Sequence, residues 1–371
     1  MNSGLARLAF RRALAPAVHA GPAVPAVIGA WILLALFGLT RDWAGTNALL
    51  QTAGEGGDPG AAARGMLREG VWTILAISIL PLLVFRTARS VSVWRSGESE
   101  WLASRGVGRG AILVSTWIGT WAGGATLLAL ACLAIELRAG AAAPSLRRGP
   151  DLALPSGAFS SRARIGSRGP LAWTAPDTSA IAGARARVQI GFVSGAGSAG
   201  EILFRAKRDR DERTGRARIS SHGSIEVELP PGSGAIGFEL SCASPGTTAV
   251  VLSDAVEVWS PCASDRAAGV EILIRILVAF AAWTALALGL AAWVSPSIAS
   301  LAILAAWIPA WLGDIAPRWL PGADLWDALS IVGMGRVPAA LDSRAFAVGT
   351  LLALVGLALA AVGLRSWRGS A

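Results

Sequence analysis

The stretch FRTARSVSVWRSGESEWLASRGVGRGAILVSTWIG, residues 85–119, starts as a polar, arginine-rich segment and turns into an apolar one. It lies between two long apolar segments, at residues 70–85 and 111–137. An excess of arginine in a short loop between membrane spans marks the cytosolic side of the membrane. We therefore expect residues 86–109 to form a cytosolic loop, which sets the orientation of the other spans.

The composition is typical of a membrane protein. Of the 371 residues, 53% are hydrophobic and only 15% are charged, and the mean hydropathy is +0.54. A chain this apolar is expected to cross the lipid bilayer several times. Its formal charge of +9 comes almost wholly from arginine. That charge is weak evidence for a nucleic-acid partner, and we expect none.

The apolar segments predict a polytopic α-helical membrane protein with six transmembrane helices. These helices are expected at residues 22–39, 70–85, 111–137, 270–294, 298–312 and 345–364. Six spans place both termini in the cytosol. Residues 1–20 resemble a basic amphipathic segment on the membrane surface. A cleaved signal peptide is the alternative, which we disfavour because the apolar run that follows is long enough to span the membrane.

Residues 138–267 differ from the rest because their hydrophobic pattern alternates. Apolar and polar residues take turns over 225–229 and 236–242, and a Pro-Pro-Gly-Ser-Gly turn signal at 230–234 separates these runs. The pattern predicts an inserted all-β, sandwich-like domain, with 138–180 as a loose linker. The predicted topology makes this domain extracytoplasmic. The expected parts are residues 1–20, 21–137 with the 86–109 loop, 138–267, and 268–371.

Two charged residues near the start of the fourth predicted span form a candidate outer gate. Glu271 and Arg275 are four residues apart, so they lie on one face of a helix near the outer surface. Charged pairs at that depth are found in polar gates of membrane pathways. The simpler interpretation is that both side chains snorkel to the membrane interface.

Cys242 and Cys262 form a candidate disulfide. Both lie in the predicted β-domain, where an oxidising exterior would allow them to bridge. Two separate thiols are the alternative, because the pairing geometry is not visible in a sequence. Cys132 lies within an apolar segment and is expected to pack there.

The chain lacks the residues of the common catalytic and cofactor sites. It contains no G-x-x-x-x-G-K-[ST] motif, so it is not expected to bind ATP through a P-loop. His19 and His222 are its two histidines, too few for a histidine-rich metal site or a histidine-based triad. We expect no metal, no cofactor and no enzyme activity in this chain alone.

The central stretch resembles the type-2 family of ABC transporter permeases. In that family a glutamate-containing turn, a leucine-rich stretch, a Pro-Val-Ser-Arg-like turn and an Ile-Leu-x-x-Lys-x-x-Gly entry follow the second span. Residues 98–119 here correspond, from Glu98-Ser-Glu100-Trp-Leu102 to Trp117-Ile118-Gly119. Two positions depart from the pattern: Gly106 stands where proline is usual, and Thr116 stands near the usual lysine.

The resemblance implies the membrane-spanning permease subunit of an ATP-driven exporter in the inner (cytoplasmic) membrane. Its partners would be an ABC ATPase subunit and a second permease copy or paralogue. The loop would couple the ATPase to the spans through Glu98, Glu100, Leu102, Arg105 and Arg109. The alternative for each residue is a solvated loop charge or side chain without such a role.

The sequence is also compatible with a second function. The chain would then be a non-transporting membrane receptor or assembly scaffold, whose β-domain binds a ligand or a partner and whose spans anchor it. An exporter needs an ATPase at the 86–109 loop, whereas a scaffold does not.

Overall fold

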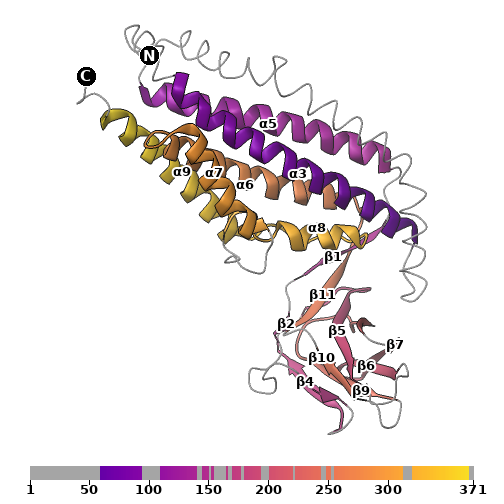
Figure 1. Ribbon diagram of the computed structural model, residues 1–371. Coiled ribbons are helices and arrows are strands. Elements are labelled where there is room, and N and C mark those ends of the chain that lie inside the picture. The colour runs from indigo at the N-terminus through magenta and orange to yellow at the C-terminus, as the bar shows by residue number, and fades with distance from the viewer. Residues whose placement is uncertain are drawn as a thin grey trace. The chain divides into compact units, whose positions relative to one another are not determined.

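The computed structural model of the chain describes most of its helices and strands (Figure 1). It covers residues 59–93, 109–139, 144–149, 152–153, 164–165, 169–176, 179–193, 200–219, 222–243, 248–251, 255–311 and 320–366. The chain divides into two compact units by its internal contacts. One comprises the helices on either side of residues 143–265, and is called the helical unit here; residues 143–265 form the strand unit.

The helical unit contains long apolar helices that lie lengthwise beside one another (Figure 1). Its elements are α3 (Pro59–Val93), α5 (Arg109–Ala139), α6 (Ala267–Ala291), α7 (Pro296–Trp311), α8 (Leu325–Gly333) and α9 (Ser343–Ser366). Within the described residues, four helices are long and apolar enough to cross a membrane. These stretches are Arg64–Val91, Leu113–Leu137, Ala267–Ala291 and Ser343–Gly363.

The prediction of six transmembrane helices with an inserted sandwich-like domain is therefore wrong. The described residues contain four such helices, and the strand-rich part is two antiparallel sheets in the middle of the chain. The first predicted span, 22–39, lies outside the described residues, as does segment 1–20. The fifth, 298–312, corresponds to α7, whose 16 residues make a helix of about 24 Å. That is shorter than the ~30 Å hydrocarbon core of a bilayer.

α3 and α5 form an antiparallel pair. Arg68, early in α3, contacts Glu136 near the end of α5, while Leu83 packs against Gly124. An early residue of α3 contacts a late residue of α5, and a later residue of α3 contacts an earlier residue of α5. The two helices therefore run in opposite directions. The connection between them comprises residues 94–108, which lie outside the described residues.

α5 is also antiparallel to α6, and two of its tryptophans hold the pair together. The indole N–H of Trp117 donates to the Ala281 carbonyl and to the Thr284 hydroxyl, both at 3.2 Å. Trp121 donates to the Leu277 carbonyl at 3.1 Å. These bonds satisfy indole N–H groups inside an apolar bundle, where an unpaired donor is costly. Trp117 and Trp121 therefore lie inside the helical unit, between α5 and α6.

α6 and α9 run parallel and meet along a seam of small residues. Three glycines of α9 recur every seven residues, and each packs against an α6 residue of the same spacing. The pairs are Gly349 with Val278, Gly356 with Ala285, and Gly363 with Ala292. A seven-residue repeat keeps one face of a helix on its partner, and small residues let the backbones approach closely.

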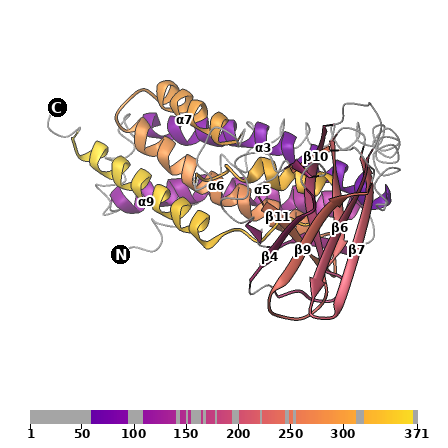
Figure 2. The ribbon, with the colours of Figure 1, turned by 90° about the horizontal axis from the view of Figure 1, so that it is seen from below.

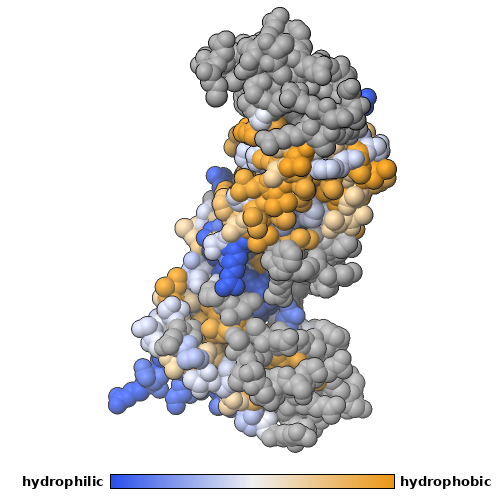
Figure 3. All heavy atoms as spheres, turned by 90° about the vertical axis from the view of Figure 1, so that its left-hand side faces the viewer, coloured by the Kyte–Doolittle hydropathy of each residue, from blue (hydrophilic) through white to orange (hydrophobic). Residues whose placement is uncertain are grey.

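The outward face of α9 is apolar. Leu351, Leu354, Val355, Leu359 and Val362 are all exposed in the chain. Figure 3, which looks from the side on which α9 lies in Figure 1, shows hydrophobic residues gathered on the helical unit. An apolar helix face of this size suits contact with lipid tails.

The strand unit consists of two antiparallel sheets. Its strands are β1 (Ser145–Arg148), β2 (Leu152–Ala153), β3 (Arg164–Ile165), β4 (Leu171–Ala175), β5 (Arg185–Val193), β6 (Gly200–Arg208), β7 (Asp211–Ile219), β8 (His222–Glu228), β9 (Ile236–Cys242), β10 (Thr248–Val251) and β11 (Ala255–Cys262). The seven-stranded sheet has the order β1-β11-β5-β10-β3, with β2 on β11 and β8 on β5. The four-stranded sheet has the order β4-β9-β6-β7, which Figure 2 shows side by side.

The two sheets share one hydrophobic core. Trp173, Phe204 and Phe238 of the smaller sheet stack with ring centroids 5.2–6.2 Å apart. Val188 and Ile225 of the larger sheet belong to the same buried cluster. The alternating segments predicted as strands are confirmed, but the predicted loose linker 138–180 is not, since it contributes β1–β4 to the sheets.

Candidate functional site

Charged side chains gather at one end of the helical unit. Arg68 comes from α3, Glu136 from α5, Glu271 and Arg275 from α6, and Asp324 from the residue before α8. These five residues are called the ion-paired end. The opposite end of the unit is packed by an apolar cluster from the end of α3, the start of α5 and the end of α6.

Arg68 and Glu136 form a bidentate ion pair between α3 and α5. The Arg68 Nε donates to Glu136 Oε1 at 2.9 Å, and NH2 donates to Oε2 at 2.7 Å. The two side chains are 3% and 12% exposed. At this burial, removing one partner leaves an uncompensated charge, which is strongly destabilising. The pair therefore fixes the register of α3 against α5.

Gly269 of α6 makes room for this ion pair. A Cβ at position 269 would lie 2.6 Å from Glu136 Oε1 and 3.5 Å from the Cys132 sulfur. No side chain fits there without moving the carboxylate. A glycine at this position lets the paired carboxylate of α5 rest directly on the start of α6.

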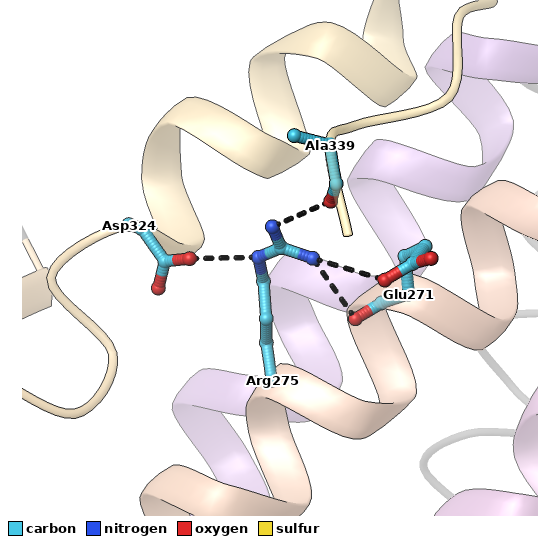
Figure 4. A network of polar contacts seen from close by, with 4 residues as sticks. All are labelled: Glu271, Arg275, Asp324 and Ala339. Atoms are coloured by element: carbon cyan, nitrogen blue, oxygen red, sulfur yellow. Dashed lines mark hydrogen bonds and ion pairs between the residues drawn. The ribbon is translucent and has the colours of Figure 1, made fainter. Parts of the chain in front are cut away.

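Arg275 uses all three guanidinium nitrogens at once, as Figure 4 shows. Its Nε donates to Asp324 Oδ2 at 2.8 Å, and its NH2 donates to the Ala339 carbonyl at 2.8 Å. Its NH1 lies 3.5 Å from Glu271 Oε2, which confirms that the i,i+4 pair shares one helix face. Arg275 is 6% exposed, so it does not snorkel as the simpler interpretation expected.

The Arg275 network ties α6 to both flanks of α8. Asp324 precedes α8 and Ala339 follows it. α8 is a helix whose Leu325, Leu329 and Val332 are buried. Its apolar spacing places one face inward, and Trp326 and Met334 remain exposed.

The ion-paired end is a set of charged side chains that bind one another. Its five side chains carry three negative and two positive charges, and each arginine is bound by a carboxylate. In the part of the chain that the structure describes, no group of three or more metal-ligating residues lies close enough to hold an ion. The arrangement can hold helices in position and release them if the ion pairs break.

The other predicted site residues are only partly covered. Glu98, Glu100, Leu102 and Arg105 lie outside the described residues, and Arg109 is the first residue of α5. The structure does show that the predicted 86–109 loop begins later, because α3 continues as a helix to Val93. The coupling role of these residues stays a prediction.

Neither Cys242 nor Cys262 forms a disulfide in the structure. Cys242 ends β9 of the four-stranded sheet, whereas Cys262 ends β11 of the seven-stranded sheet. The Cys262 thiol lies 3.5 Å from the Ser264 carbonyl. This arrangement matches the alternative of two separate thiols.

Sequence reasoning missed Arg68 and Asp324 as partners. Neither residue was singled out from the sequence. A signal for Arg68 exists, since it lies at the start of one apolar segment and Glu136 lies at the end of the next. Asp324 lies 49 residues from Arg275, and nothing local connects them.

Comparison with known proteins adds no assignment: no family model, no curated protein and no solved structure matches the chain.

Proposed function

We propose that the chain is the membrane-spanning permease subunit of an ATP-driven ABC exporter and works with a separate ATPase. The observation that carries this proposal is the antiparallel α3–α5 pair and its arginine-rich connection. Arg86 and Arg89 lie in the last turns of α3, and residues 94–108 add further arginines before α5. Positive charge at this end favours the cytosol, where an ATPase would dock.

The length of α3 suits the transmission of motion. Its 35 residues make a helix of about 52 Å, against ~30 Å of hydrocarbon. A force on residues 86–93 would therefore act on one continuous helix, which passes through Pro81 and reaches Arg68. There the bidentate pair with Glu136 would pass the movement to α5.

The ion-paired end would form the outer gate in this proposal. The strand unit is connected to the end of α5 and the start of α6, opposite the 94–108 connection. It would then be extracytoplasmic and would receive substrate or bind a partner. Both termini would be cytosolic, and a second permease copy or paralogue would complete the transporter in the inner membrane.

The test is co-purification with the ABC ATPases encoded by neighbouring genes, in mild detergent. We expect an ATPase to co-purify with the wild type and to be lost in the Glu98→Arg/Glu100→Arg variant. The matched control is Glu212→Arg/Glu228→Arg, a double charge reversal at exposed strand positions. This control should retain the ATPase.

Either of two outcomes would reject the coupling proposal. Loss of the ATPase in both double variants would show a general effect of charge or folding. Absence of any ATPase from the wild type would favour the receptor or scaffold function, and the ligand of the strand unit would become the question.

A further inference from the structure

The start of α8 lies deep along α6. The indole N–H of Trp283 donates to the Pro321 carbonyl at 3.0 Å. Gly322 packs near Ala279, 3.6 Å from its Cβ, and near the Trp307 indole of α7. Ala279 is the thirteenth of the 25 residues of α6, so this contact lies about halfway along the span.

The end of α8 lies at the ion-paired end. Gly65 of α3 packs directly on the Val332 carbonyl and on the Gly335 backbone, with no room for a side chain. Gly65 is one turn before Arg68, whose partner Glu136 lies against Gly269 in the first turn of α6. α8 therefore runs from the middle of α6 to its first turn.

α7 lies along the other half of α6, from its end to its middle. It begins at Pro296, just after α6 ends, and Ala299 packs in the apolar cluster with Ala291 and Ala292. It then runs back along α6 until Trp307 lies beside Gly322. The 16 residues of α7 and the 9 of α8 together match the 25 residues of α6.

We propose that α7 and α8 are two halves of one interrupted membrane crossing, and that Arg275 is the latch that holds α8 in it. Interrupted crossings occur where the backbone is buried in protein. Here the described start of α8 is covered by α6, and its end is covered by α3. The inference rests on these contacts and does not depend on ATPase coupling.

Two glycines bracket α8 as hinges. Gly322 has a φ of +93° and Gly335 a φ of +73°, in the left-handed region that glycine adopts without strain. Between them α8 is a helix that can turn as one piece. Hinge motion of this kind concentrates the change in backbone angles at a few residues.

The polar contacts of Arg275 hold α8 in place more firmly than its apolar contacts do, because lipid tails can replace apolar contacts. In hydrocarbon, the apolar face of α8 loses little when lipid tails take the place of α3. The Asp324 carboxylate and the Ala339 carbonyl have no such substitute, since lipid tails offer no donor. Arg275 supplies donors to both, so its removal frees both flanks of α8.

Hydrogen exchange of the full chain in lipid nanodiscs tests the latch. In Arg275→Leu we expect the amides of residues 320–340 to exchange on the order of a hundredfold faster, as for a broken buried ion pair, with α9 unchanged. Arg344→Leu is the matched control, since Arg344 is exposed at the start of α9. It should leave exchange in α8 at the wild-type rate.

A covalent link between α3 and α8 separates release of α8 from misfolding. The Glu69 carboxylate lies against Gly333, so Glu69→Cys/Gly333→Cys, with the native cysteines changed to alanine, should let a short bifunctional thiol reagent bridge α3 to α8. Combined with Arg275→Leu, the bridge should restore slow exchange in α8. Unchanged exchange in Arg275→Leu, or fast exchange across all helices that the bridge does not correct, would overturn the latch.

Spin labels test the interrupted crossing itself. Trp326 and Met334 are 45% and 41% exposed, at opposite ends of α8. Labels at these positions should differ, with Trp326→Cys more accessible to oxygen and Met334→Cys more accessible to a water-soluble nickel complex. Equal access of the nickel complex to both would show that α8 lies outside the bilayer.

Discussion

Replacing Gly356 by alanine should destabilise the helical unit, although alanine favours a helix. The added methyl group would lie 2.5 Å from the Ala285 carbonyl oxygen and 2.6 Å from the Leu286 nitrogen of α6. Ordinary contact begins at 3.4 Å, so the two helices would have to separate by about 1 Å. Because the obstacle is backbone, no side chain can rotate away to relieve the contact.

The size of the effect follows from two opposing terms. Overpacking a core lowers the unfolding free energy by about 1–3 kcal/mol. Because the α6 backbone cannot move aside, we expect a loss of ~3 kcal/mol at this site. Alanine stabilises a helix by about 1 kcal/mol relative to glycine, which offsets part of this loss. The net loss of unfolding free energy should therefore be about 2 kcal/mol, which is large compared with the error of a denaturation experiment.

The assay is unfolding by SDS in mixed micelles, followed by the fluorescence of the chain's 16 tryptophans. Gly110→Ala is the matched control, because a Cβ at this helical glycine meets nothing within 4 Å. It should be as stable as the wild type or up to ~1 kcal/mol more stable. If Gly356→Ala is as stable as Gly110→Ala, the close contact of α6 with α9 is refuted.

Three further predictions concern single contacts. Arg68→Met should lower the unfolding free energy by about 3–5 kcal/mol in the same assay. Arg68→Met/Glu136→Leu should cost less, and an equal cost would argue against the ion pair. Cys242 and Cys262 should both react with a maleimide before any reductant is added, as mass spectrometry would show; labelling only after reduction would demonstrate a bridge. Trp173→Ala should cost the strand unit about 3–5 kcal/mol, seen as faster amide exchange in its core strands but not in α6.

Some of the fold follows from local pattern alone. The apolar run at 111–137 became α5, Arg109–Ala139, because a helix satisfies its own backbone and needs only length and hydrophobicity. The alternation at 236–242 became β9, whose Ile236, Phe238 and Leu240 are buried in the strand core. In each case the signal lies within one element.

The candidate site was predicted only in part for the same reason. Glu271 and Arg275 are one helical turn apart, so their shared face follows from the period of the helix. Their burial does not follow from it. The snorkelling alternative would suit an isolated helix end, but the segment around α8 covers Arg275 and supplies two of its partners.

The local pattern of residues is enough to predict where the chain is apolar, where it alternates and which charges lie near the ends of its apolar segments. These are properties of neighbouring residues, and they fix the type of each element. The contacts of Asp324 with Arg275, of Gly356 with Ala285 and of α8 with α6 are visible only in the folded chain. Such contacts join residues far apart in the chain, and they form only when backbones approach in a geometry that no local pattern encodes.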